Sequence, residues 1–156
     1  MIALIQRVVE ASVRIGAETV GEIGPGLVAL IGVRPEDVAD DAVRLVQRVL
    51  AYRIFADADG RMNHSLAQAC GGLLVVPQFT LAADTGKGLR PGFSTAAAPE
   101  RGRELFDLFV SAARANHSPV ETGVFGAHMH VSLVNDGPAT FWLEAHAAAR
   151  AGLAQN

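Results

Sequence analysis

The feature that most constrains the fold is a set of short apolar runs separated by turn residues. Leu27–Val33 and Leu73–Phe79 are apolar along almost their whole length, and Ile2–Val9 is apolar apart from Gln6 and Arg7. Runs of this length, bounded by signals such as Gly24-Pro25-Gly26, predict buried strands more readily than helices. We therefore expect a sheet at the centre of the protein.

Two longer segments have the periodicity of amphipathic helices. The first opens at Pro35-Glu36-Asp37 and runs through Tyr52, with apolar residues at helical spacing. Asp37 is the expected N-cap, and Asp40 and Asp41 favour the helix dipole in the first turn. The second helix is expected from Pro99 to about Ala115, where His117-Ser118-Pro119 stops it.

The remaining apolar stretches are short, which is typical of half-exposed strands. They are Ser12–Ile15, Glu18–Ile23, Arg53–Ala56, Met129–Leu133 and Thr140–Leu143, with a loop over residues 82–98. A turn is expected at Asp136-Gly137-Pro138, between the last two strands. The predicted fold class is α+β: a mainly antiparallel sheet or open barrel with two main helices, in a single domain over residues 1–145. Residues 146–156 form an Ala-rich tail that we expect to extend as a frayed helix.

Composition limits the class of protein and its partners. The chain has 156 residues, of which 50% are hydrophobic and 19% charged, so it fits one folded domain and is too apolar for disorder. The formal net charge of −3 does not favour broad nucleic-acid binding, and an RNA partner would have to be contacted locally, for example at a tRNA end. Cys70 is the single cysteine, which excludes an intramolecular disulfide and a CxxC zinc pattern. Without a signal peptide or a run of about 18 apolar residues, we expect a cytoplasmic protein with no membrane contact.

Two segments place small or polar residues where an apolar run ends: Pro77-Gln78-Phe79-Thr80-Leu81 and Asn135-Asp136-Gly137-Pro138-Ala139-Thr140. No His, Cys or carboxylate pair accompanies their threonines at motif spacing, so they are more typical of backbone devices than of side-chain catalysts. Gly137-Pro138 removes one N–H, fixes one φ angle and leaves two carbonyls that no side chain shields. Such carbonyls can test the shape of a ligand, although a plain hairpin turn is the alternative.

In order along the chain, four blocks resemble the D-aminoacyl-tRNA deacylase family. They are MIALIQRV (Met1–Val8), YRIF (Tyr52–Phe55), QFTLAAD (Gln78–Asp84) and VSLVNDGP (Val131–Pro138), and the resemblance covers nearly the whole chain. One departure is Pro77, where the family pattern usually has Ser. The resemblance implies the same α+β fold, assembled as a homodimer with the active site at the interface.

The resemblance also implies a reaction and a basis for chirality. The expected reaction is hydrolysis of the ester of D-aminoacyl-tRNA, to free D-amino acid and tRNA. In the family the matching Gly-Pro bond is cis and enters the partner's pocket, so Gly137 and Pro138 are expected to exclude L-amino acids sterically. Glycyl-tRNA has no side chain to exclude and is a further expected substrate.

For catalysis the candidates are Gln78, Phe79 and Thr80. A threonine hydroxyl is a poor nucleophile without a base, so a covalent role for Thr80 is the less favoured alternative. We expect Thr80 and the N–H groups of Phe79 and Thr80 to hold the scissile carbonyl and the attacking water, as an oxyanion hole does. The vicinal ribose hydroxyl of the tRNA is thought to assist in the family. Gln78 is expected to fix the loop, or else is an ordinary polar residue at a strand end.

Three further residues are assigned to substrate binding. Arg7, at the end of the first strand, is expected to brace Gly137-Pro138 through main-chain carbonyls, with a snorkelling surface arginine as the alternative. Phe125 and Met129 are expected to stack on the terminal adenine of the tRNA, the 3′ terminal adenosine being the expected contact, with core packing as the alternative.

No metal or organic cofactor is expected. His128 and His130 share one strand face but lack a third ligand, so a solvated face is favoured over a metal site. Lys87 and Arg90 are expected either to touch phosphates of a single-stranded end or to be plain solvated charges. Two other functions stay open: a related deacylase of L-aminoacyl mischarged tRNA, and a non-catalytic nucleic-acid-binding module on the same fold.

Overall fold

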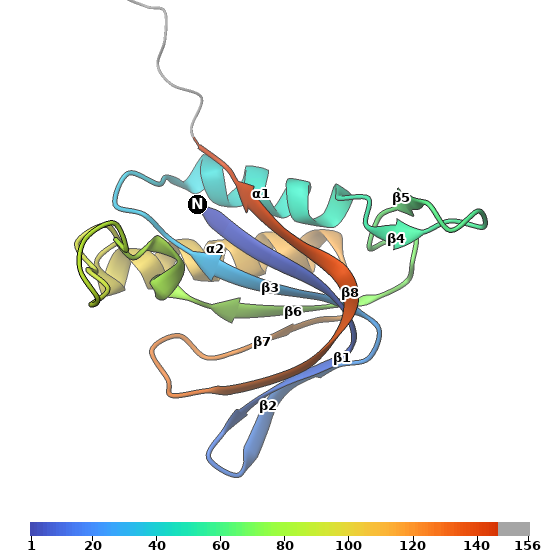
Figure 1. The fold of residues 1–156 in the computed structure, drawn as a ribbon, viewed down its shortest axis with the longest axis horizontal. Coiled ribbons are helices and arrows are strands. Elements are labelled where there is room, and N and C mark those ends of the chain that lie inside the picture. The colour runs from blue at the N-terminus through green and yellow to red at the C-terminus, as the bar shows by residue number, and fades with distance from the viewer. Residues whose placement is uncertain (147–156) are drawn as a thin grey trace, which may run out of the picture.

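The computed structural model describes residues 1–146, which form a curved main sheet with two helices packed on one side and a separate two-stranded sheet (Figure 1). The strands are β1 (Ile2–Ile15), β2 (Glu18–Ile23), β3 (Gly26–Gly32), β4 (Phe55–Ala56), β5 (Met62–His64), β6 (Gly72–Pro77), β7 (Val120–Thr122) and β8 (His130–Glu144). The helices are α1 (Ala39–Ala51) and α2 (Pro99–Asn116), with one short 3-10 helix, η1 (Phe79–Ala82).

The main sheet has the order β2-β1-β3-β6-β7, and β8 pairs with the other edge of β1. β1 is antiparallel to β2, β3 and β8, whereas β6 is parallel to both β3 and β7. The sheet curls until β2 meets β7: a Cβ on Gly21 would lie 2.9 Å from the carbonyl oxygen of Thr122. The predicted fold class, a mainly antiparallel and nearly barrel-shaped sheet with two helices, is confirmed.

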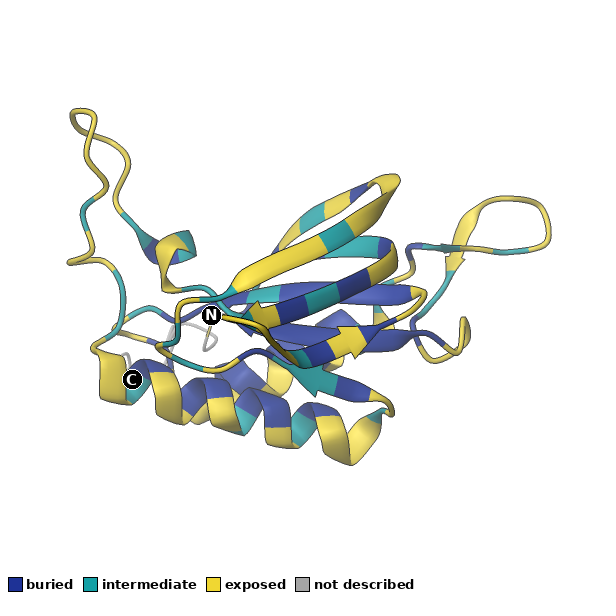
Figure 2. Ribbon diagram, turned by 90° about the horizontal axis from the view of Figure 1, so that it is seen from below, coloured by how far each residue is buried: buried dark blue, intermediate teal, exposed yellow. Residues whose placement is uncertain are grey.

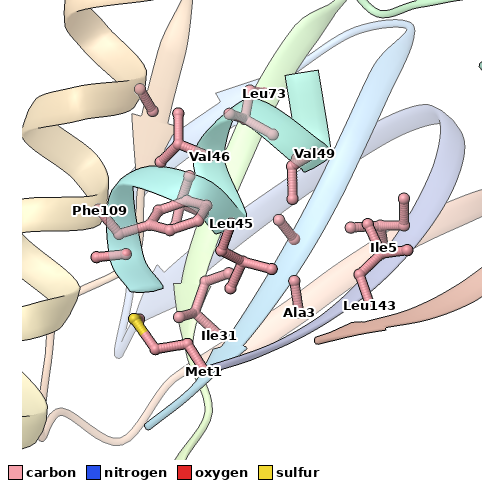
Figure 3. Packing of buried hydrophobic residues seen from close by; sticks show 14 of the residues in the cluster. Met1, Ala3, Ile5, Ile31, Leu45, Val46, Val49, Leu73, Phe109 and Leu143 are labelled. Atoms are coloured by element: carbon pink, nitrogen blue, oxygen red, sulfur yellow. The ribbon is translucent and has the colours of Figure 1, made fainter. Parts of the chain in front are cut away.

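The apolar residues form two cores, one on each face of the sheet. The larger core lies between the sheet and the helices, where Met1, Leu45 and Phe109 are fully buried (Figure 3). The smaller core fills the inside of the curl and includes Val13 and Leu74. Burial on both faces explains why the strands read as continuous apolar runs. Exposed residues lie on the outer faces of the helices, on the loops and along much of β8 (Figure 2).

The N-cap prediction for Asp37 is wrong. α1 begins at Ala39 after Val38, whose N–H donates to Asp41 Oδ2 at 2.9 Å. Asp37 is almost fully buried and instead accepts from the Met1 ammonium at 2.5 Å and from the Arg34 N–H at 2.7 Å. A buried carboxylate requires such partners, and Met1 lies too far away in sequence for local pattern to predict the contact.

The predicted turn at Asp136-Gly137-Pro138 is also wrong, because β8 continues through it. Gln6 pairs with Thr140 and Val8 with Asn135, so the four residues 136–139 lie opposite the single residue Arg7, three more than a regular ladder has. This insertion is a special β-bulge, followed by a second register shift between Val8 and Glu10, in a strand that pairs with β1 on both sides of it. Gly137 and Pro138 therefore project from the middle of a long strand.

Several predicted boundaries also change. Ile2–Val9 and Ser12–Ile15 are parts of one strand, and the predicted strand Leu73–Phe79 ends at Pro77 because η1 begins at Phe79. Strand Arg53–Ala56 shortens to β4, Met129–Leu133 begins one residue later, and β5 and β7 were not predicted. The expected second helix is confirmed as α2. The helix expected in the tail lies almost wholly outside the described residues.

Candidate active site

A cavity of about 470 Å³ opens where β3 and β6 end, beside the start of α2. Four of the predicted site residues line it: Gln78, Phe79, Phe125 and Met129. Among the other lining residues are Ile31, Val76, Pro77, Pro99, Gly102, Phe106 and His128. Thr80, Arg7, Gly137 and Pro138 are not among the lining residues.

The loop after β6 presents hydrogen-bond donors at the edge of the cavity. The Gln78 N–H donates to the Ile31 carbonyl at 2.8 Å, which ties the loop to β3. The Gln78 side-chain amide donates to the Thr80 hydroxyl. The backbone N–H groups of Phe79 and Thr80 donate no hydrogen bond within residues 1–146, and both residues are exposed. Two adjacent donors are therefore free to meet an acceptor from a ligand.

The loop over residues 82–98 lies beside these donors. The Phe79 ring is 55% exposed, and its centroid lies 5.1 Å from that of Phe93 in the loop. A bridge between Asp84 and Gly92 closes the loop into a narrow projection. Lys87 and Arg90 are exposed near its tip, so their cationic groups are accessible from solvent.

Phe125 and Met129 form another wall of the cavity. The Phe125 ring centroid lies 6.1 Å from that of Phe106, and the Arg103 guanidinium carbon lies 5.0 Å from the Phe125 centroid. The Met129 sulfur accepts from the Val124 N–H at 3.3 Å. Phe125 both packs against the larger core and lines the cavity. The position of Phe125 is thus compatible with both roles considered from sequence, core packing and stacking on adenine. Contact with adenine stays a prediction.

Hydrogen bonds between β1 and β8 hold Asn135 and Asp136, which directly precede Gly137 and Pro138. Arg7 Nε donates to the Asp136 carbonyl at 3.2 Å and lies 2.8 Å from Asp136 Oδ2, while Nη1 donates to the Ile54 carbonyl. The Asn135 side chain donates to the Arg7 carbonyl at 2.9 Å. The Gly137–Pro138 peptide bond is cis, as the resemblance implies. Arg7 lies in the interior of β1, not at a strand end, because β1 continues to Ile15.

Within one chain, the Gly137-Pro138 segment and the Gln78–Thr80 segment lie at opposite ends of the sheet. Val8 pairs with Asn135 on one side and with Gly26 on the other, and Gly26 pairs with Gly72 at the start of β6. Gln78 follows the other end of β6, six residues beyond Gly72, and a rise of ~3.3 Å per residue makes this roughly 20 Å. Figure 1 shows the bend of β8 far from the arrowheads of β3 and β6. One protomer does not bring the two predicted segments together.

The histidines near the cavity do not form a metal site with other described residues. The rings of His128 and His130 lie 5.3 Å apart, and only His128 lines the cavity. Within residues 1–146, no three or more His, Cys, Asp or Glu side chains are placed to hold a metal ion. None of the helices in this range is long and apolar enough to span a lipid bilayer.

Sequence reasoning missed the contribution of α2 to the cavity. Pro99, Gly102 and Phe106 come from the first turns of this helix and line one side. The available signal was Gly102, an isolated glycine inside a helical pattern, since such a glycine usually has a packing or functional reason.

Comparison with known proteins identifies the family. The family model described as D-Tyr-tRNA(Tyr) deacylase matches residues 4–144. The chain is 64% identical over 144 residues to a D-aminoacyl-tRNA deacylase of Thioalkalivibrio sulfidiphilus, covering 92% of this chain and 97% of the relative. It is 59% identical over 145 residues to one of Azotobacter vinelandii, covering 93% and 100%.

Two solved structures share the fold. One, named c-Myc DNA Unwinding Element Binding Protein, superposes with a TM-score of 0.89 at 35% identity, covering 94% of this chain and 100% of the other. The other, described as a probable eukaryotic D-amino acid tRNA deacylase, has a TM-score of 0.78 at 18% identity, covering 92% and 98%, and supports the fold alone. From the family match and the two bacterial relatives, we conclude that the chain belongs to the D-Tyr-tRNA(Tyr) deacylase family.

Proposed function

We propose that this protein is an esterase that hydrolyses D-aminoacyl-tRNA to a free D-amino acid and tRNA. The family match over residues 4–144 supports the reaction class. The observation that carries the assignment of the site is the pair of N–H groups at Phe79 and Thr80, beside the cavity, which donate to no acceptor in the described part of the chain. Developing negative charge on a tetrahedral intermediate is stabilised by such preorganised donors.

The proposed reaction proceeds by attack of water on the ester carbonyl carbon. The carbonyl oxygen becomes an oxyanion that accepts hydrogen bonds from the Phe79 and Thr80 N–H groups. The bond from the carbonyl carbon to the ribose oxygen then breaks, and this oxygen takes the proton lost by the water. Gln78 supports the geometry by holding the Thr80 hydroxyl. The vicinal ribose hydroxyl of the substrate assists in activating the water.

In the proposal, the Gly137 and Pro138 carbonyls of one subunit reach the active site of the other subunit. There they select the chirality of the bound substrate. Their separation from Gln78, roughly 20 Å by strand rise, argues against selection within one chain. An L side chain strikes these carbonyls, while a D side chain or the hydrogen of glycine points elsewhere. Glycyl-tRNA is accordingly a further proposed substrate.

The proposed homodimer uses the outer side of β8. Of the fifteen residues of this strand, only Ala139 and Leu143 are buried within one protomer. Val131, Val134 and Trp142 are 37%, 50% and 48% exposed. Apolar side chains along a strand with an unpaired edge are the features that a second copy would cover.

In the same proposal the 3′ terminal adenosine occupies the cavity, against Phe125 and Met129. A volume of about 470 Å³ is within the ordinary range for sites that bind a small molecule. Aromatic and thioether side chains suit the face of a base. In the proposal, the exposed Lys87 and Arg90 contact phosphates of the single-stranded end.

The test is deacylation of matched D- and L-tyrosyl-tRNA at several enzyme concentrations. Release from the D ester only, with specific activity falling on dilution, supports the D-specific dimeric enzyme. Release from both esters supports the alternative deacylase of L-aminoacyl-tRNA. Gly137→Ala tests the chiral segment, and Gly24→Ala is its matched control in the second Gly-Pro pair, where an added Cβ meets nothing within 4 Å. Wild-type D and L rates in Gly137→Ala would argue against the proposed role.

The name of one related structure keeps a binding function as a second candidate. The c-Myc DNA Unwinding Element Binding Protein is 35% identical to this chain over nearly its whole length. A net charge of −3 does not favour this function. Tight duplex binding with a steep salt dependence, and no deacylation, would favour it over the esterase.

A further inference from the structure

We propose that Gly102 and Arg103 of α2 are positioning residues that set the Phe125 wall of the cavity for an adenine base. Gly102 gives the ring the room it occupies, and Arg103 fixes the ring and its backbone from outside. The inference rests on the proposed function in one respect, since it takes a substrate that ends in adenosine.

Gly102 is buried in α2 and lines the cavity. A Cβ at this position would lie 3.2 Å from Phe125 Cζ and 3.6 Å from Cε2. The first distance is shorter than ordinary carbon–carbon contact, so the ring would have to move by a few tenths of an ångström. Glycine destabilises a helix interior relative to alanine, and its presence here matches a need for clearance.

Arg103, the next residue, contacts Phe125 in two ways. Its guanidinium carbon lies 5.0 Å from the ring centroid, within the range of a cation–π contact. Its Nη2 donates to the Phe125 carbonyl at 3.3 Å. One side chain thus restrains both the ring and the main chain that carries it.

α2 holds Phe125 from a third position. Phe106, one turn beyond Gly102, has its ring centroid 6.1 Å from that of Phe125, with the two planes tilted by 50°. Three residues of α2 therefore lie against Phe125, although Phe125 itself lies in the segment before β8. A small change on α2 should reach the cavity through this ring.

The same arrangement recurs on the Met129 side. A Cβ on Gly123 would lie 2.8 Å from the Met129 sulfur. Both predicted base-contacting side chains therefore stand in space that a glycine leaves open. This similarity supports a role for the two glycines in setting the width of the cavity. The binding of a flat aromatic base depends on the separation of the cavity walls.

The experiment measures adenosine binding and urea unfolding for the full chain and its variants. Gly102→Ala should keep or raise the urea midpoint, because alanine favours the helix, yet weaken adenosine binding by about fivefold or more, the low end for a lost stacking contact. KM for D-tyrosyl-tRNA should rise, with little change in kcat. Arg103→Ala should weaken adenosine binding in the same direction, while Arg114→Ala, exposed at the other end of α2, is its matched control.

A double-mutant cycle separates clearance from general disturbance of the helix. In a Phe125→Leu background the ring edge is gone, so Gly102→Ala should cause no further loss of adenosine affinity. Wild-type adenosine affinity in Gly102→Ala, an equal further loss in the Phe125→Leu background, or no adenosine binding by the wild-type protein would each overturn the inference. Failure of the proposed function can be distinguished from failure of this inference. If only the proposed function fails, the wild-type protein does not deacylate D-tyrosyl-tRNA but still binds adenosine, and Gly102→Ala still weakens that binding.

Discussion

Replacing Arg7 with lysine tests how the bulge of β8 is held. The Arg7 side chain is 13% exposed and its guanidinium contacts the Asp136 carbonyl, the Asp136 carboxylate and the Ile54 carbonyl. The arginine fork reaches these groups in different directions, whereas lysine has a single charged nitrogen. Arg7→Lys keeps the charge but should no longer donate to both Asp136 and the Ile54 carbonyl at once.

The expected loss can be worked from these contacts. The Asp136 carboxylate is 53% exposed, so its ion pair contributes at most about 1 kcal/mol to the free energy of unfolding. A hydrogen bond from a charged donor contributes about 1.5 kcal/mol or more, and lysine should lose at least one of the two to carbonyls. We expect Arg7→Lys to lower the free energy of unfolding by about 1–2 kcal/mol.

The functional consequence should exceed the loss of stability. The Asp136 carbonyl directly precedes Gly137, so freeing it should let the Gly137 and Pro138 carbonyls move. We expect the ratio of D- to L-tyrosyl-tRNA hydrolysis to fall by about tenfold, which corresponds to about 1.4 kcal/mol of lost discrimination. Urea unfolding and initial rates on both esters measure the two effects, with Arg14→Lys on the same strand as control. A destabilised Arg7→Lys protein with an unchanged ratio would refute a role for this arginine in chiral selection.

Three other variants probe the catalytic loop and the periphery. Thr80→Ala should keep kcat/KM for D-tyrosyl-tRNA within about tenfold of wild type, because the proposed donors are main-chain; a loss above about a thousandfold, the scale of a strong oxyanion donor, would contradict this. Cys70→Gly should raise the free energy of unfolding by about 0.5–1 kcal/mol in urea, because Cys70 has φ of 53° in the left-handed region; an unchanged midpoint would count against that reasoning. Hydrogen bonds from Trp142 and two basic neighbours lower the pKa of Glu144 from 4.5 to about 2. Glu144 should therefore contribute about 1 kcal/mol to the free energy of unfolding above pH 4.5, after allowance for its partial exposure, and this contribution should disappear towards pH 2. In urea unfolding, the free energies of wild type and Glu144→Gln should accordingly converge as the pH falls from 4.5 to 2.

The apolar runs predicted the sheet well because burial on both faces leaves a local signal. Leu27–Val33 and Leu73–Phe79 became the parallel pair β3 and β6 with small changes at their ends. The strand β7 was missed because Val120–Thr122 is only three residues long and is specified by its neighbour β6. Short strands at the edge of a sheet depend on tertiary contacts, so the hydrophobic periodicity of the sequence does not predict them.

The Gly137-Pro138 segment shows why a turn signal can mislead. Asp, Gly and Pro in succession ordinarily predict a change of chain direction. Here the strands on both sides pair with one long partner, β1, so the extra residues form a bulge and the chain continues in its original direction. Arg7 pairs with this bulge across 129 residues of sequence, a distance that only the three-dimensional fold can close.

Residue 77 is a proline, whereas the family resemblance leads us to expect a serine there. The structure suggests why a proline is acceptable at this position. Pro77 is the last residue of β6 and lines the cavity, and it lies beyond the part of β6 that pairs with β7, because the last residue of β7, Thr122, pairs with Val75. Proline removes the N–H at residue 77 but leaves those of Phe79 and Thr80, which have no partner within residues 1–146. Asp57 and Glu144, whose pKa values the fold lowers, do not line the cavity. The proposed mechanism can therefore accept Pro77, because the proposed donors are main-chain N–H groups of Phe79 and Thr80, which are present whatever the side chain at residue 77 is.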